Sequence, residues 1–399
     1  MPRIAFYSHD TMGLGHLSRC VKLARALSSL PGELEGVFIT GSPWTHLFSP
    51  PSDFRFVELP PVKKSGRWTY CSRVQGVDLK TVLRERQVRI LRALQELQPD
   101  LLVVDNVPDG LLGEMLPALE RFRDSTKVVL ALREILDRTD KIAEEWNERG
   151  ATEAAAYLYD EIWLFGDDSD ARELVDGGPL AKTSATLVAC GRLGACEDEP
   201  NGPGDGSSRP RRHPTPGGSR RPLVTLTGGG GADALPMVQT YMNALTLYRP
   251  RVDSHIILGP DFPMERFSSM EAQNDSAVRS DSFVPQLSEI LRASDVVVSM
   301  AGYNTVSEIL ASGCRAVLVP RSGPREEQIL RAERLERAGR ASVVYPQDLD
   351  PRTLWEAITA ALDTPVPSPE RLQGGTVAAS RAAKLLSCDN GKGARQWNA

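Results

Sequence analysis

The sequence predicts an α/β protein with two domains, each built on a parallel β-sheet that is covered by helices. Short apolar segments rich in β-branched residues alternate with amphipathic helical segments, which is the pattern of parallel sheets. The chain has 399 residues, more than one hydrophobic core normally serves. A polar stretch near its middle has almost no apolar residue and therefore separates two folding units.

This polar stretch sets the expected domain boundaries. Residues 194–222 are rich in Gly, Pro, Ser and Arg and are predicted to be a flexible linker. The N-terminal domain is then expected over residues 1–193 and the C-terminal domain over residues 223–367. Residues 368–399 are expected to form a last helix, to about residue 386, and a disordered tail.

The strands and helices of both domains are predicted from hydrophobic periodicity. In the first domain we expect helices after the first strand and at 81–97, and strands at 3–7, 37–41, 56–59, 101–104, 128–132, 162–166 and 186–190. In the second we expect helices at 234–247 and 351–362, and strands at 223–226, 255–258, 295–299 and 316–320. The acidic run at 167–170 lies where a helix begins, a place where acidic residues are expected without any metal.

Composition narrows the class of protein and its partners. The net charge of −5 gives no reason to expect a nucleic acid partner, and 41% hydrophobic residues are ordinary for a globular protein. The six cysteines are scattered, with no pair or Cys/His cluster at zinc spacing, so we expect reduced thiols in a cytoplasmic protein. The chain runs directly into a strand, so no signal peptide is expected. No apolar run approaches the roughly 20 residues of a membrane span.

The stretch from Ser299 to Gly313 carries the clearest binding motif. A predicted strand turns at Gly302 into a helix, whose first amides near Asn304 and Thr305 form an anion site. Glu308 lies one turn later, where a carboxylate can accept both hydroxyls of a ribose. It can equally be a solvated helix residue, but the next strand and the Gln328 that follows it favour a binding site.

A glycine run opens the second domain in the same manner. Thr227, Gly228, Gly229 and Gly230 lie between a predicted strand and a helix, where backbone amides can hold a phosphate. The run is not a Walker loop and lacks the spacing of dinucleotide folds.

A third motif follows the first strand of the chain. Gly13 and Gly15 let the turn bring backbone close to a ligand, and His16 then begins a helix above the sheet. A helix N-terminus tends to keep an imidazole neutral, which suits a general base. The alternative is that His16 is an ordinary surface residue.

Other candidates follow strands or lie in one long loop. Asp105, Arg133 and Glu134 come at carboxyl ends of strands, where side chains project into the crevice, although each can also be a cap or an ion-pair partner. Residues 60–78 form a long polar and aromatic loop containing Arg67 and Trp68. Its basic residues suit an anionic acceptor, and the other interpretation is a plain flexible loop.

These motifs resemble those of the GT-B glycosyltransferases, and most closely the N-acetylglucosaminyltransferases that form lipid II. The resemblance implies two Rossmann-like domains facing a cleft, with Glu308 on the ribose, Gln328 on the donor sugar and the glycine run on the diphosphate. It also implies that the backbone at Phe283 and Val284 recognises uracil. The motif from Gly13 to Arg19 resembles even more closely that of a nucleotide-sugar hydrolase of pseudaminic acid synthesis, in which the histidine activates water.

The resemblance favours a transferase that moves a sugar, N-acetylglucosamine as the first choice, from a UDP-sugar to a small-molecule, carrier-bound or lipid acceptor. Its reaction is expected to be inverting and to need no cofactor or metal, because no DxD pair follows a strand. The candidate catalytic residues are His16, Asp105 and Glu134. The alternatives are a nucleotide-sugar hydrolase and a non-catalytic nucleotide-sugar-binding protein. The expectation of no membrane span still allows peripheral contact with a membrane.

Overall fold

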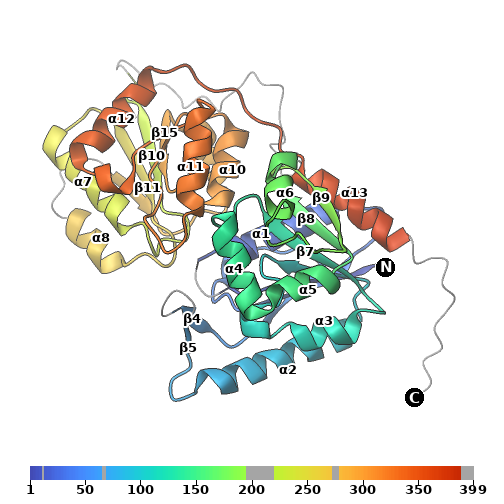
Figure 1. The fold of residues 1–399 in the computed structure, drawn as a ribbon. Coiled ribbons are helices and arrows are strands. Elements are labelled where there is room, and N and C mark those ends of the chain that lie inside the picture. Colours follow the sequence, from blue (N-terminus) through green and yellow to red (C-terminus); the bar gives the residue numbers. More distant parts are fainter. Residues whose placement is uncertain (11–12, 65–68, 195–219, 272–277, 388–399) are drawn as a thin grey trace. The chain divides into compact units, whose positions relative to one another are not determined.

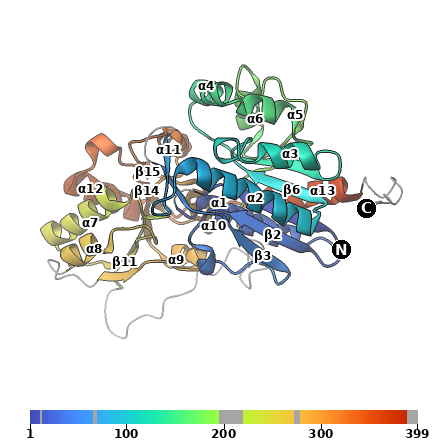
Figure 2. The same ribbon diagram turned by 90° about the horizontal axis from the view of Figure 1, so that it is seen from below.

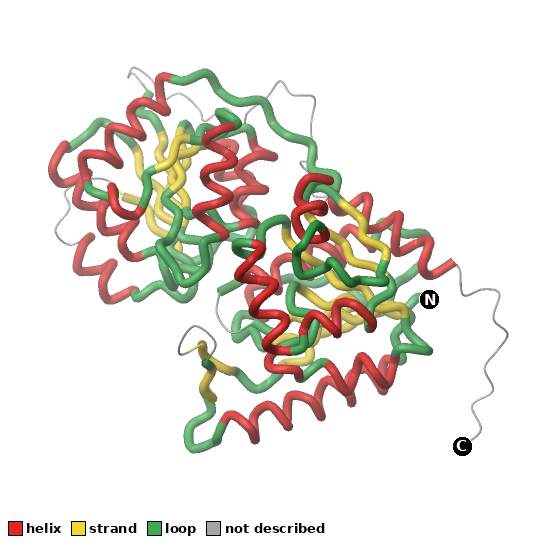
Figure 3. Tube along the Cα trace, in the orientation of Figure 1, coloured by secondary structure: helices red, strands yellow, loops and turns green. Residues whose placement is uncertain are grey.

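A computed structural model describes residues 1–10, 13–64, 69–194, 220–271 and 278–387. It divides the chain into two compact units. One consists of Met1–Thr11, His16–Leu193 and Gln373–Ala399, and the other of Met12–Gly15 and Gly194–Leu372. Each unit is an α/β domain with helices on both sides of its main sheet (Figure 3). Most of the predicted linker and the predicted tail lie outside the described residues.

The sheet of the first unit is entirely parallel, in the order β3-β2-β1-β6-β7-β8-β9. Its strands are β1 (Arg3–Ser8), β2 (Glu35–Thr40), β3 (Phe54–Glu58), β6 (Leu101–Asp105), β7 (Lys127–Arg133), β8 (Glu161–Phe165) and β9 (Thr186–Ala189). The helices around it are α1 (Gly15–Leu27), α2 (Leu79–Leu97), α3 (Leu116–Phe122), α4 (Thr139–Arg149), α5 (Ala151–Tyr157), α6 (Asp168–Val175) and α13 (Gly374–Ser387) (Figure 1 and Figure 2).

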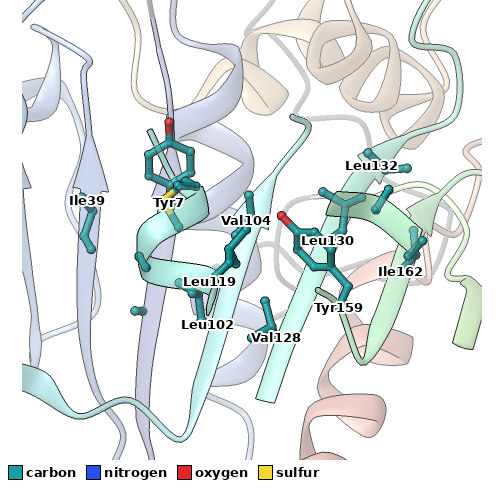
Figure 4. Close-up of a cluster of buried hydrophobic side chains, with 14 of the residues drawn as sticks. Tyr7, Ile39, Leu102, Val104, Leu119, Val128, Leu130, Leu132, Tyr159 and Ile162 are labelled. Carbon is teal, nitrogen blue, oxygen red and sulfur yellow. The ribbon is translucent and has the colours of Figure 1, made fainter. Parts of the chain in front are cut away.

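Burial on both faces explains why the strands of this sheet are continuous apolar runs. All five residues of β6 and of β8 are buried. On one face of the sheet, Leu102 and Val104 of β6 and Ile162 of β8 form one core with Tyr7 of β1 and Leu119 of α3 (Figure 4). The acidic run at 167–170 opens α6, as predicted: Asp167 accepts from the amides of Ser169 and Asp170 in a capping box.

The second unit has the same plan, with a parallel sheet in the order β12-β11-β10-β13-β14-β15. Its strands are β10 (Leu223–Thr227), β11 (Asp253–Ile257), β12 (Val278–Asp281), β13 (Val296–Ser299), β14 (Ala316–Leu318) and β15 (Ser342–Val343). Its helices are α7 (Leu235–Tyr248), α8 (Met264–Glu271), α9 (Leu287–Ala293), α10 (Tyr303–Ser312), α11 (Glu327–Arg337) and α12 (Pro351–Asp363). One apolar cluster joins the sheet to α7 and α12, and another joins it to α10 and α11.

The structure corrects the predicted loop at residues 60–78. The segment contains an antiparallel hairpin of β4 (Val62–Lys64) and β5 (Tyr70–Ser72). Val62 is buried in a small cluster with Val82 of α2, and that contact gives the segment a core of its own. Arg67 and Trp68 lie outside the described residues.

The last helix also begins later than predicted. It was expected from residue 368, whereas α13 runs over Gly374–Ser387. Ser368 precedes Pro369 and is therefore disfavoured from the helical conformation, and the Glu370 amide donates to the Leu310 carbonyl at 2.9 Å instead of joining a helix. The helix belongs to the first unit, where Arg381 pairs with Glu161 of β8 and the Gly374 amide donates to the Arg192 carbonyl at 2.9 Å.

Candidate active site

In each sheet, successive strands are added first on one side of the first strand and then on the other, so the strand order has one point of reversal. Several candidate residues of each unit follow the two strands that flank this point, which we call the switch point. The reversal lies between β1 and β6 in the first sheet and between β10 and β13 in the second. Parallel sheets of this type bind ligands at the carboxyl ends of the strands that flank such a point. His16 follows β1 and Asp105 ends β6, while the glycine run follows β10 and Gly302 follows β13.

In the first unit the structure brings His16 and Asp105 into contact. The Nδ1 atom of His16 lies 2.5 Å from Oδ2 of Asp105. The ring remains about one-fifth exposed, whereas Asp105 is buried. Nη2 of Arg19 lies 2.9 Å from the same nitrogen. In the tautomer in which Nδ1 donates its proton to the carboxylate, Nε2 carries the lone pair. This is the tautomer that a general base requires.

Arg19, one helical turn after His16, completes the cluster. Its Nε donates to Oδ1 of Asp105 at 3.0 Å and its Nη2 donates to Oδ2 at 2.8 Å. Burial raises the pKa of the Asp105 carboxyl, but Arg19 and His16 lower it more strongly, and the net pKa is below its usual value. Asp105 therefore stays charged while it orients the imidazole.

The other two predicted residues of this unit lie one strand further along. Arg133 ends β7 and Glu134 follows it, and β6 separates β7 from β1. Oε1 of Glu134 accepts from Arg192 at 3.0 Å. The arrangement thus places Asp105, and not Glu134, against His16. Gly13 has a φ of +74°, and Gly15 is the first residue of α1, so both stand in the turn before the histidine.

Sequence reasoning missed two neighbours of His16. The ring of His9 lies 4.6 Å from that of His16, centroid to centroid. Asp10 is 1% exposed, and its Oδ2 accepts from Ser8 at 2.5 Å and from Thr40 at 2.9 Å. Both residues follow β1 directly, so their place at a strand end was the signal that could have found them.

In the second unit the glycine run is shaped by close backbone packing. A β-carbon at Gly228 would lie 2.6 Å from the Leu258 carbonyl oxygen. A β-carbon at Gly231, whose φ is +96°, would lie 2.7 Å from the Leu258 carbonyl oxygen and from the Phe262 amide nitrogen. Thr227, at the end of β10, is buried. A β-carbon therefore does not fit at Gly228 or Gly231, and the turn lies close against the backbone at Leu258 and Phe262.

The helix α10 begins and ends where the sequence predicts. Gly302 is its N-cap and has no side chain to bond the first amides, and Gly313 closes it with a φ of +61°. Asn304 and Thr305 lie in the first turn, and the half-buried Glu308 lies one turn later. Phe283 and Val284 are half-buried in the segment between β12 and α9.

Gln328 is buried in the first turn of α11 beside a charged cluster that sequence reasoning also missed. Its Oε1 accepts from the amide of Arg321 at 3.3 Å. The guanidinium of Arg321 pairs with Glu327 and with Asp233, the latter two residues beyond Gly231. Nothing in the spacing of these residues indicates that they meet.

Two searches were negative within the described parts of the chain. They contain no group of three or more His, Cys, Asp or Glu side chains placed to hold a metal ion. Nor does any helix there have the length and apolar character needed to cross a membrane.

Comparison with known proteins identifies the class to which this architecture is similar. Residues 223–384 match the model of the glycosyltransferase family 28 C-terminal domain. The crystal structure of MurG from Acinetobacter baumannii superposes with a TM-score of 0.56 over 98% of this chain and 99% of that chain, at 13% identity. Together with the two parallel-sheet units, this likeness confirms the predicted GT-B fold.

Relatives at the sequence level sharpen the resemblance. An uncharacterized glycosyltransferase of Methanopyrus kandleri is 29% identical over 165 residues, which are 41% of this chain and 44% of the relative. A Bacillus cereus N-acetylglucosamine transferase acting on N-acetylmuramyl-(pentapeptide) pyrophosphoryl-undecaprenol is 40% identical over 138 residues, 34% of this chain and 38% of the relative. The matches therefore span less than half of these relatives. They confirm the resemblance to MurG-like GT-B glycosyltransferases that the motifs predicted.

Proposed function

We propose that this protein is a glycosyltransferase that moves a sugar, N-acetylglucosamine as the first choice, from a UDP-sugar to an acceptor. The acceptor is a small molecule, a carrier-bound group or a lipid. The observation that carries the proposal is the His16–Asp105 pair at the switch point of one sheet. It occurs in a chain whose other sheet lies in a segment matching the family 28 C-terminal domain.

The predicted C-terminal domain, residues 223–367, is proposed to hold the donor. The uncapped start of α10 and the glycine turn from Thr227 to Gly230 offer amides to the diphosphate. These amides can stabilise the leaving group without a metal. By resemblance, Glu308 holds the ribose, Gln328 contacts the sugar, and the backbone at Phe283 and Val284 recognises the base.

His16 is proposed to act as the general base. Its Nε2 takes the proton from the attacking hydroxyl or amine of the acceptor while that atom bonds to the anomeric carbon. The bond from this carbon to the diphosphate breaks at the same time, and UDP leaves with the electron pair. A single displacement of this kind inverts the anomeric centre. Asp105 stabilises the imidazolium that forms.

The predicted N-terminal domain, residues 1–193, is proposed to bind the acceptor, with residues 194–222 as the linker. Gly13, Gly15 and Arg133 are the proposed acceptor-binding residues, and the β4–β5 hairpin adds Lys63 and Lys64, which suit an anionic acceptor or peripheral contact with a membrane. A cytoplasmic location fits a UDP-sugar as donor.

The test is to incubate the protein with a panel of nucleotide sugars, with and without lipid and soluble acceptors, and to measure free nucleotide. A transferase releases UDP slowly until the right acceptor is added. The relatives named above are transferases, so the comparisons do not favour the hydrolase alternative. Fast release of UDP without any acceptor, dependent on His16, would overturn the proposal and show that the protein is a nucleotide-sugar hydrolase.

A further inference from the structure

Arg321 occupies a junction in the second unit that no motif marks. It follows β14 at the carboxyl edge of the sheet, three residues after Leu318. Its guanidinium spans two elements: Nη1 donates to Asp233 at 2.9 Å, and Nη2 donates to Glu327 at 2.6 Å. Asp233 follows the glycine turn, and Glu327 opens α11. One side chain therefore ties the turn after β10 to the start of α11.

The Glu327 side of this bridge is the stronger one. The Glu327 side chain is 2% exposed, compared with 44% for Asp233. A buried carboxylate without its cation is strongly unfavourable, whereas an exposed ion pair contributes little. The pair with Glu327 therefore holds the Arg321 side chain in place. The pair with Asp233 connects that side chain to the glycine turn.

The main chain of Arg321 also orients Gln328. Its amide donates to Oε1 of Gln328, so Nε2 is the end of that side chain that can donate to a ligand. One turn further along α11, Arg331 donates to the carbonyl of Ala301, beside the start of α10. The helix that carries Gln328 is thus tied to both ligand-facing turns of the sheet.

The glycine turn itself does not need this bridge. The amide of Gly231 donates to the carbonyl of Gly228 at 3.0 Å, and the amide of Asp261 donates to that of Gly230 at 2.9 Å. These backbone bonds hold the turn independently, so it can serve as a fixed anchor for Arg321.

We propose that Arg321 is a positioning residue that anchors the sugar-binding Gln328 to the phosphate-binding turn. It sets Gln328 as a hydrogen-bond donor to an oxygen of the donor sugar, a hydroxyl or an N-acetyl carbonyl. This inference rests on the proposed function, in which the second unit binds a UDP-sugar. Arg321 contributes to the affinity for the sugar and not to that for the nucleotide.

Calorimetric titration with UDP and with UDP-N-acetylglucosamine tests the inference. Arg321→Gln is expected to weaken binding of the UDP-sugar by about 3–10-fold, the range for one lost hydrogen bond, and to leave UDP affinity within about twofold. Arg321→Lys is expected to recover only part of the loss, because a single ammonium does not reproduce the guanidinium fork. Arg352→Gln, which removes an arginine from an exposed pair with Glu356, is the matched control and should change neither affinity.

A second variant guards against misfolding. Arg321→Gln combined with Glu327→Gln removes both charges of the pair, so the buried carboxylate does not lose its arginine partner, and the selective loss for the UDP-sugar should persist. Equal weakening of UDP and UDP-sugar, no weakening of either, or recovery in the double variant would each overturn the inference alone. Failure of the wild-type protein to bind UDP would overturn the proposed function and the inference with it.

Discussion

The two sheets reverse their strand order in the same way, between β1 and β6 in the first and between β10 and β13 in the second, but different chemical groups lie at the two reversals. The first sheet presents side chains there: His16, Asp105 and Arg19 form one hydrogen-bonded cluster. The second presents backbone, with a glycine turn after β10 and, after β13, a helix start whose N-cap, Gly302, has no side chain to bond the first amides. Side chains can exchange a proton at neutral pH, whereas backbone amides can only hold an anion. The contrast predicts that substitutions in the first unit affect turnover and those in the second affect nucleotide binding.

The largest effect is expected at His16. Replacement by Ala should lower turnover by roughly two to four orders of magnitude, the usual contribution of a positioned base. The affinity for UDP should stay nearly the same, because the nucleotide is proposed to bind the other unit. Steady-state kinetics and calorimetry on the same preparation check both parts. A similar loss of UDP affinity would contradict the proposal that one unit supplies the base and the other binds the nucleotide.

The next effect is expected in the glycine turn. Gly231→Ala places a β-carbon 2.7 Å from two backbone atoms at a φ of +96°, so we expect a loss of about 3 kcal/mol or more in stability and weaker UDP binding. Gly229→Ala is the matched control: its φ is +59°, nothing lies within 4 Å, and only about 1–2 kcal/mol of conformational cost is expected. Denaturant unfolding and UDP titration measure both variants, and equal losses would show that backbone packing does not shape the turn.

A smaller effect is expected at Glu308. Replacement by Ala should weaken UDP binding by about 1.5–3 kcal/mol, the range for hydrogen bonds to a charged group. Thermal stability should change little, since the side chain is only half-buried. Titration with UDP and with uridine checks the assignment to the ribose, because both ligands should lose the same factor. An unchanged dissociation constant in a folded variant would move the nucleotide elsewhere.

The smallest effect concerns pH. The pKa of Asp105 is lower in the folded protein than its ordinary value of 3.8, so its contribution to stability is complete above that value and is lost as the pH falls through the folded pKa. The stability advantage of wild type over Asp105→Asn should therefore be constant from pH 6 to about 4 and shrink at lower pH. Urea midpoints of both proteins across this range provide the measurement. A difference that does not change down to pH 3 would show that Asp105 is not held charged by Arg19 and His16.

The alternation of strands and helices was readable from the sequence because burial imposes it locally. A strand covered on both faces must be apolar throughout, which located β6, β8 and β13 within a few residues. Gly302 and Gly313 marked the two ends of α10, because a helix start and a left-handed closing residue each favour glycine. The β4–β5 hairpin was missed, because its short strands gain their core only from α2.

The sequence by itself therefore determined the architecture, the two glycine turns after β10 and β13 and the family resemblance, since each depends on neighbours along the chain. Only the tertiary structure decided which charges meet. Asp105 is 89 positions from His16 and Asp233 is 88 positions from Arg321, and both pairs form because parallel strands bring their carboxyl ends to one edge of a sheet. Asp105 and Glu134 follow their strands in the same manner in the sequence. The strand order, with β6 next to β1 and β7 beyond it, selects Asp105 as the partner of His16.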